Sequence, residues 1–436
     1  MTGKTMSDAP VRTPALALGH KLTLFVLMLT MVLSYTDRFL LAALAQSIKQ
    51  EMKLSDTMLG LLTGFAFSLV YAVWSLPMAR LSDRGYRRTS LTGSVLVWSL
   101  VTSATGLCMT GAQLFFARFG VGIGEAGALP ASHALIADTY PASKRSTALA
   151  FFTVGGPIGM LIAFGAGGWL NVHIGWRATF GLVGATGLLL ALALRFCLPP
   201  DTLQSPAQRS SAKLDLVVIR RLTSDRAFLH LLIGISLSVL LLFGQTQWIS
   251  PFFERSFPSH HATLGPTLAY TRMAAMVVGL LVGGLASDRF SRERIDTPIL
   301  FMAIAYGLGF IPQVASYCVA ELWEALALSS IAGFAISLAG APSAASILNL
   351  APASMRATAS ALSLMTSAII GMGGGPLLIG YASDLLTPYF GDQALRYALI
   401  LFNLVFTPWM LLHLVLAARS VRGRLPADIA AKDVVV

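Results

Sequence analysis

The sequence predicts an all-α membrane protein whose twelve transmembrane helices form two six-helix, pseudo-symmetric halves. Three observations lead to this fold class: the composition, twelve apolar stretches of membrane-spanning length, and an internal repeat. Of the 436 residues, 55% are hydrophobic and only 12% are charged, whereas soluble proteins carry about 25% charged residues. So little charge cannot cover the surface of a water-soluble globule. The composition therefore excludes a soluble enzyme, a disordered chain and a nucleic-acid-binding domain.

The charge balance fits a membrane protein. The formal net charge is +11, but the basic residues are scattered over short loops and form no stripe of the kind that binds nucleic acid. An excess of Lys and Arg in cytoplasmic loops is the usual cause of such a balance. Cys108, Cys197 and Cys318 lie in apolar runs without metal-ligand or disulfide spacing. We therefore expect no metal site, no cofactor and no nucleic-acid partner.

Twelve apolar stretches account for most of the chain. A helix needs about 20 predominantly apolar residues to cross a bilayer. The stretches lie near residues 22–46, 57–80, 89–109, 112–139, 146–170, 177–198, 228–252, 264–287, 297–317, 321–349, 356–383 and 395–418. Nothing between them is long enough for a soluble domain. The first 20 residues hold no apolar segment followed by a cleavage site, so we expect an uncleaved first span.

The loops predict the orientation of these spans. With the N-terminus placed inside, the inner loops and tails carry more than four times as many Lys and Arg residues as the outer loops. The outer loops carry only Lys49, Lys53, Arg177, Arg255 and Arg396. Because basic residues accumulate on the cytoplasmic side of membrane proteins, both termini are expected in the cytoplasm.

The longest loop divides the spans into six and six. We expect a cytoplasmic linker at residues 199–226, between an N-terminal bundle of residues 22–198 and a C-terminal bundle of residues 227–418. Cytoplasmic tails are expected at residues 1–21 and 419–436. The second part of the linker places Leu214, Val217, Val218 and Leu222 on one helical face. This pattern favours an amphipathic helix on the inner leaflet, with a plain linker as the alternative.

The two halves repeat each other in sequence. Residues 141–150, PASKRSTALA, match residues 352–361, PASMRATASA, at seven of ten positions. Residues 79–84, ARLSDR, correspond to residues 284–289, GLASDR, at the end of the second span of each half. Duplicated six-helix halves are typical of secondary transporters, whose binding site lies between the repeats near the middle of the membrane.

The loop after the second span resembles a family motif. Residues 79–88, ARLSDRGYRR, look like the loop between helices 2 and 3 of the major facilitator superfamily. Ala79 and Tyr86 stand where that pattern has glycine, but Asp83, Arg84 and the final basic pair are kept. The resemblance extends over essentially the whole chain, because the helix count, the loop pattern and both repeats agree. It implies the major facilitator fold and a monomer.

Two further motifs resemble a narrower family. Residues 35–39, YTDRF, and residues 118–126, RFGVGIGEA, are similar to the helix-1 and helix-4 signatures of Spinster transporters. Animal Spinster proteins export lipids or lysolipids, including sphingosine-1-phosphate. The resemblance implies a bacterial member in the inner membrane that couples transport to protons.

Charged residues inside the expected spans point to a functional site. An Asp, Lys or Arg at the centre of a membrane helix costs roughly 2.5–3.5 kcal/mol on insertion scales, so Asp37, Arg38, Arg118, Glu125 and Arg272 must pair or face water. Arg118 and Glu125 project from one helical face. We hypothesise that Asp37 and Glu125 compete for Arg38 and Arg118. Glu125 is the first candidate for proton carrier and Asp37 the second, while a purely structural ion network is the alternative.

Several other side chains are candidates for substrate contact. Arg38 and Arg118 suit a phosphate or carboxylate group, and Tyr35 belongs to the helix-1 motif. Arg272 is a candidate from the second half, with snorkelling at the helix end as the alternative. The remaining two candidates each have a plainer alternative, a structural hydrogen bond or contact with water: His133 and Gln245.

A separate group of charges is expected to gate the cytoplasmic side. These residues would bridge the halves and favour the outward-open state, and the alternative is that they only set topology. In the first half they are Asp83, Arg84, Arg88 and Arg145, and in the second Asp288, Arg289 and Arg356.

The leading functional interpretation is a proton-coupled secondary transporter that works by alternating access. Its partners would be protons, the lipid bilayer and a small amphiphilic or anionic organic solute, including a lipid or lysolipid of sphingolipid type. The alternative within the superfamily is a multidrug or organic-anion exchanger. A membrane-embedded enzyme is disfavoured because the histidines are scattered without ligand spacing. No phosphate-binding GxxxxGK[ST] motif is present.

Overall fold

The computed structural model describes residues 14–201, 216–290, 296–352 and 355–422, and over these ranges it contains helices and short turns but no strand. Helices in the first half run unbroken, are divided by π-helical turns or, between Glu125 and Ala128, are separated by a short turn. They are α1 (Pro14–Met52), α2 (Asp56–Gly60), η1 (Leu61–Phe65), α3 (Ala66–Asp83), α4 (Arg87–Thr105), α5 (Gly111–Glu125), α6 (Ala128–Thr139), α7 (Ala142–Ile162), η2 (Ala163–Gly167) and α8 (Gly168–Cys197).

The second half repeats this order after a short helix, α9 (Leu216–Ser224). Its elements are α10 (Arg226–Ser256), η4 (Pro258–His260), α11 (His261–Leu268), η5 (Ala269–Met273), α12 (Ala274–Phe290), α13 (Asp296–Ser316), α14 (Leu322–Ser337), α15 (Gly340–Leu350), α16 (Arg356–Thr366), η7 (Ser367–Gly374), α17 (Gly375–Phe390), η8 (Gly391–Gln393) and α18 (Ala394–Val421).

Seven helical segments among the described residues are long and apolar enough to cross a membrane. Two of them, Thr147–Cys197 and Thr358–Val421, each contain two expected spans. Gly175, with φ +77°, separates the two spans of the first. The other three expected spans fall short of the criterion because α4 is rich in Ser and Thr, while α5–α6 and α14–α15 are each interrupted by a short break. This grouping is compatible with twelve spans.

Small residues let helices within a half approach closely. The α1 and α7 helices pack against each other over much of their length. A Cβ atom on Gly159 of α7 would lie 2.3 Å from the carbonyl oxygen of Val32 on α1. Membrane helices gain little from apolar burial against lipid, so such close backbone contacts are a main source of their association.

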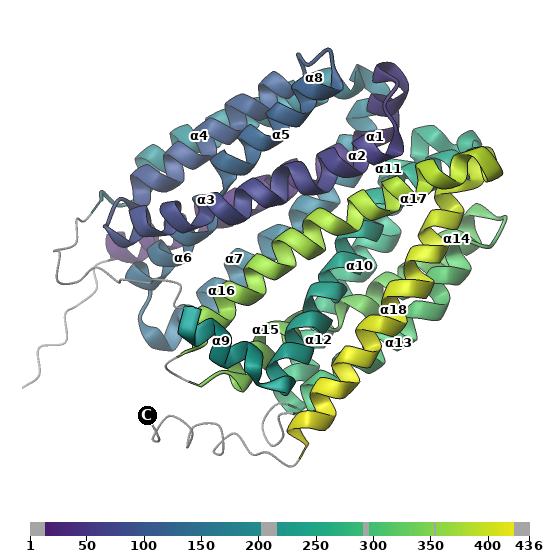
Figure 1. Ribbon diagram of the computed structural model, residues 1–436. Helices are drawn as coiled ribbons and strands as arrows, with labels where there is room; N and C mark the ends of the chain where they lie inside the picture. Colours follow the sequence, from purple (N-terminus) through teal and green to yellow (C-terminus); the bar gives the residue numbers. More distant parts are fainter. Residues whose placement is uncertain (1–13, 202–215, 291–295, 353–354, 423–436) are drawn as a thin grey trace, which may run out of the picture.

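Figure 1 shows the halves side by side, with α1–α8 in one and α10–α18 in the other. We call the end of the molecule where α1 stops and α2 begins the Asp56 end, and the opposite end, where α3 stops, the Asp83 end. At the Asp56 end α2 packs on α17. A Cβ atom on Gly380 of α17 would lie 2.2 Å from the carbonyl oxygen of Asp56. The halves are therefore in tight backbone contact at this end.

The linker contains the short helix α9, which packs on α10 and α16. Leu222 is buried and Val218 packs against the core of the second half. Val217 is 74% exposed, so it does not share the buried face that the sequence pattern assigned to it. The four positions of this face were assigned from an ideal helical period over a longer segment, and one of them, Leu214, lies outside the described residues.

Candidate functional site

Four charged side chains meet in the middle of the first half. Asp37 and Arg38 come from α1, and Arg118 and Glu125 come from α5. Arg38 forms an ion pair with Glu125, and Arg118 Nη1 lies 3.4 Å from Asp37 Oδ2. All four residues are at most 8% exposed. The structure thus brings together the four residues that the sequence grouped.

The helical geometry explains this pairing. Arg118 and Glu125 lie two turns apart on one face of α5, whereas the adjacent Asp37 and Arg38 diverge by about 100° around α1. Each residue of α1 therefore reaches a different partner on α5. The result is two ion pairs between α1 and α5, with the arginine on α1 in one pair and on α5 in the other.

Neutral side chains complete the surroundings of the two carboxylates. The Thr102 hydroxyl donates to Asp37 Oδ1 at 2.7 Å, and the Ser34 hydroxyl donates to Glu125 Oε1 at 2.5 Å. Ser34 lies four residues before Arg38 on α1, so helical spacing could have revealed it. Thr102 lies on α4, and only the packing of that helix places it here.

Aromatic rings surround the Arg38 guanidinium. Its central carbon lies 4.9 Å from the ring centroid of Phe67, 5.3 Å from that of Tyr71 and 5.2 Å from that of Tyr35. Cation–π contact stabilises a guanidinium most where water is excluded. Tyr35 is thus placed beside the charged cluster, as its motif suggested, while Phe67 and Tyr71 were missed because they lie on α3.

Several buried polar atoms of the cluster have no hydrogen-bond partner among the described residues. They include Glu125 Oε2, Arg38 Nε, and both Nε and Nη2 of Arg118. An unsatisfied buried polar atom costs about 1–3 kcal/mol, and more when it is charged. The two ion pairs are therefore incompletely satisfied, which leaves each arginine able to take another acceptor.

The candidates of the second half lie inside their own bundle. Arg272 is 1% exposed, so it does not snorkel to the surface. Its Nη1 donates to Gln313 Oε1 at 3.0 Å and to the carbonyl and hydroxyl oxygens of Ser329 at 2.7 and 2.6 Å. Gln245 is also buried, and its Nε2 donates to Asn403 Oδ1 at 2.7 Å. Both residues are held by neighbours within the second half.

His133 lies apart from the charged cluster. Its side chain is exposed on α6, and its ring centroid is 5.7 Å from that of Phe152 on α7 in an edge-on arrangement. Within the described part of the chain, His133 forms no hydrogen bond or ion pair with the four charged residues, and its role stays a prediction.

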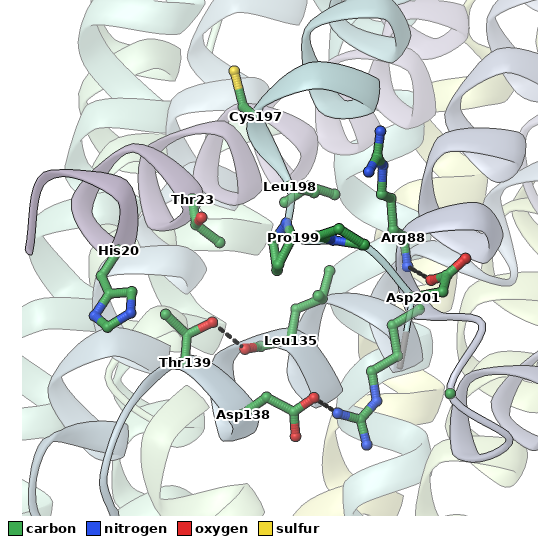
Figure 2. A pocket seen from close by; sticks show the side chains of 13 residues that line it. His20, Thr23, Arg88, Leu135, Asp138, Thr139, Cys197, Leu198, Pro199 and Asp201 are labelled. Atoms are coloured by element: carbon green, nitrogen blue, oxygen red, sulfur yellow. Dashed lines mark hydrogen bonds and ion pairs between the residues drawn. The ribbon is translucent and has the colours of Figure 1, made fainter. Parts of the chain in front are cut away.

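Of the residues expected to gate the Asp83 end, Arg88 lines a cavity of about 600 Å³ at that end (Figure 2). Asp201 Oδ1 accepts from the backbone N–H of Arg88 at 2.7 Å, and the Arg88 guanidinium donates to the carbonyl of Arg195. Arg145 Nε donates to the carbonyl of Tyr140 at 3.0 Å. These bonds lie within the first half and the start of the linker.

For the other expected gating residues, the structure gives the exposure of three side chains. Asp83 is half-buried, and Arg84 and Arg356 are exposed. The side chains of Asp288 and Arg289 lie outside the described residues. A bridge across the halves by these charges stays a prediction.

A polar network that the sequence did not predict joins the two halves at the Asp56 end. Asp56 is 2% exposed. Its carboxylate accepts from Arg255 Nη1 and Nη2, both at 2.7 Å, from Ser383 Oγ at 2.6 Å and from Lys49 Nζ at 2.5 Å. Arg255 and Ser383 belong to the second half, so one buried carboxylate of the first half binds two elements of the second.

A carboxylate of the second half likewise accepts hydrogen bonds from the first half. Asp384 of α17 accepts from the backbone N–H groups of Asp56 and Thr57 at 3.0 and 2.7 Å, and from the Thr57 hydroxyl at 2.6 Å. These are the first residues of α2, whose N–H groups have no partner within the helix. The carboxylate also suits the positive end of the helix dipole. We refer to Asp56, Thr57, Arg255, Ser383 and Asp384 as the Asp56-end lock.

The fold, the paired halves and the buried charges agree with a comparison to known families. The model of the Major Facilitator Superfamily matches residues 27–376. The chain belongs to this superfamily. It is a membrane transporter and not an enzyme.

Individual relatives cover the chain to different extents. An MFS-type efflux pump of Mycolicibacterium smegmatis is 33% identical over 86% of this chain and 87% of its own. Protein spinster homolog 1 of mouse is 27% identical over 89% of this chain and 79% of its own. A probable galactarate/D-glucarate transporter of Bacillus subtilis is 32% identical, but over only 38% of each chain.

Solved structures support the fold. The crystal structure of a bacterial homolog of the human lysosomal transporter Spinster, inward-facing and unoccupied, has a TM-score of 0.79 at 24% identity. That match covers 92% of this chain and 98% of the other. The nucleoside transporter NupG has a TM-score of 0.73 at 13% identity, over 91% of this chain and 99% of the other.

Proposed function

We propose that the protein is a proton-coupled secondary transporter that moves an amphiphilic or anionic organic solute by alternating access. The observation that carries the proposal is the pair of buried, incompletely satisfied ion pairs between α1 and α5. Buried ionisable groups in membrane helices are costly and are typical of proton relays and substrate pathways.

Glu125 is the proposed proton carrier. Its carboxylate binds Arg38 and Ser34. A proton on Glu125 would cancel the negative charge that holds Arg38 and leave that guanidinium with an excess positive charge. Arg38 would then favour an anionic group of the solute. Proton binding and solute binding would each change the affinity for the other by the same factor.

Asp37 and Arg118 form the second ion pair. We propose that this pair limits the change in net charge of the cluster while Glu125 takes up a proton and Arg38 binds the solute. Arg118 has two nitrogens without a partner among the described residues. The guanidinium of Arg118 can therefore donate a hydrogen bond to a new acceptor while it stays paired with Asp37.

The Asp56-end lock supports the alternating-access part of the proposal. With the orientation expected from the basic loops, the Asp56 end faces outward and both termini are cytoplasmic. Among the described residues, the hydrogen bonds between the two halves lie at this end. The arrangement is that of a transporter closed on the outer side, so we assign it to the inward-facing state.

The relatives narrow the solute classes to be tested. Those that cover most of the chain are named as an efflux pump and as Spinster homologs, which favours an amphiphilic solute such as a lysolipid. The sugar-acid transporters match a smaller part. They make organic-anion exchange the second candidate, which the two guanidinium groups of the cluster also suit.

A panel of solutes in proteoliposomes tests this proposal. The panel contains a lysosphingolipid, a lysophospholipid, galactarate and a cationic drug. We expect one amphiphilic or anionic member to be accumulated while a pH gradient is imposed, and a protonophore to abolish its accumulation. At 100 times its Kd, the same member should stabilise the purified protein by about 2.7 kcal/mol. Accumulation that persists after the pH gradient has collapsed would contradict proton coupling, and accumulation of the cationic drug alone would contradict the solute class.

A further inference from the structure

A small cavity inside the first half adjoins Glu125. Its volume is about 50 Å³. Its polar lining comes from four residues of α1 and one each of α3, α5 and α6: Thr30, Ser34, Tyr35, Arg38, Tyr71, Glu125 and Ser132. A buried water needs roughly 10–15 Å³ of such space and two to four polar partners. The cavity therefore has the size and the lining that a bound water requires.

Three polar atoms of this lining have no hydrogen-bond partner among the described residues. They are Glu125 Oε2, Ser132 Oγ and Arg38 Nε. Glu125 is 2% exposed and Ser132 is 0% exposed. Because buried polar groups in proteins are nearly always satisfied by protein or water, water in the cavity would supply the missing partners of Glu125 Oε2 and Ser132 Oγ.

The hydroxyl groups extend from Glu125 toward the Asp83 end. Thr30 precedes Ser34 by four residues on α1, which runs away from the Asp83 end, so Thr30 lies one turn nearer to that end. Ser132 follows Glu125 by seven residues on a chain segment that runs toward the Asp83 end. Arg38, Tyr35 and Tyr71 line the cavity as well. The hydroxyl groups of Thr30 and Ser132 thus mark a polar route from Glu125 toward the Asp83 end.

We propose that Glu125 exchanges its proton through this cavity, by way of a water held between Glu125 and Ser132, with the Asp83 end of the molecule. Ser132 is a positioning residue in this scheme. It holds the water through its hydroxyl, while the proton itself moves between that water and Glu125. The proposal rests on the proposed role of Glu125 as the proton carrier and adds the path by which the proton arrives.

Infrared spectroscopy of the purified protein tests the path without any transported solute. After a jump to acidic pH, the protonated carboxyl band of Glu125 should rise, and its absence in Glu125→Gln identifies it. We expect Ser132→Ala to slow this rise at least about tenfold, since positioned proton transfer contributes rate factors of about 10²–10⁴. Ser132→Thr, which keeps the hydroxyl, should retain the wild-type rate.

A matched control is available in the same half. Ser99 of α4 is also buried, and its Oγ likewise has no partner among the described residues, but it does not line the cavity. Ser99→Ala should leave the rate unchanged. A wild-type rate in Ser132→Ala would overturn the path alone. If no band in the wild type disappears in Glu125→Gln, Glu125 takes no proton and the proposed function fails together with the path.

Discussion

Replacing Asp56 by Ala should open the Asp56 end of the reconstituted protein. The substitution removes the carboxylate that binds Arg255 and Ser383 of the second half, and it leaves Arg255 half-buried without its counter-ion. Removing one partner of a buried ion pair costs about 3 kcal/mol or more. That cost destabilises the conformation in which the Asp56 end is closed. The ratio of molecules open at this end to molecules closed at it should therefore rise about a hundredfold.

Spin-label distances across the two halves measure this change. Labels at Lys53 and Tyr389, which are both exposed near the Asp56 end, should move apart in Asp56→Ala. The three native cysteines must first be replaced. Glu51→Ala is the matched control, because Glu51 forms an ion pair at the same end with Arg177 of its own half, at 2.8 Å. Equal distances in Asp56→Ala and wild type would show that the lock does not hold the halves together.

Replacing Glu125 by Gln should abolish proton-driven accumulation of the solute and preserve solute exchange. Glutamine has nearly the same shape and still accepts a hydrogen bond from Ser34, but it cannot take up or release a proton. We expect at least about a hundredfold loss of uphill transport, in the range typical of a lost proton-transfer group. Counterflow at equal pH needs no net proton movement and should continue.

Two variants sharpen this result. Glu324→Gln changes an exposed glutamate of α14 and should leave both activities unchanged. Asp37→Asn should have a smaller effect than Glu125→Gln, because Asp37 is the second candidate carrier. Normal uphill transport by Glu125→Gln would remove Glu125 from its proposed role.

Much of the fold could be predicted because the bilayer imposes a strict length on each span. The expected stretch 297–317 corresponds to α13, Asp296–Ser316, and the expected stretch 228–252 lies within α10, Arg226–Ser256. The break of the fourth span into α5 and α6 could not be predicted. It depends on how the glycines near residue 127 pack against α4, where a Cβ atom on Gly127 would lie 2.3 Å from Ser94 Oγ.

The charged cluster was predictable for a similar reason. A charge within a membrane span must find a partner, so the sequence grouped Asp37, Arg38, Arg118 and Glu125 before their contacts were known. The aromatic neighbours of Arg38 were not predictable, because Phe67 looks like any lipid-facing residue until the position of α3 is known.

The Asp56-end lock was missed for a different physical reason. Lys49 and Arg255 were counted only as basic residues of the outer loops, and Asp56 was not among the residues singled out from the sequence. Their burial comes from the close approach of α2 and α17, which is a property of the two halves together. No pattern within either half alone reports it.

Proton movement by wild type and Glu125→Gln is the most direct test of the central claim. Proteoliposomes with a trapped pH dye would receive each member of the solute panel in turn. Our account predicts a change of internal pH with one amphiphilic or anionic class in wild type, and none in Glu125→Gln. If a member binds and is transported while the internal pH stays constant in wild type, the protein is not proton-coupled, and the buried charges serve gating or facilitated diffusion instead.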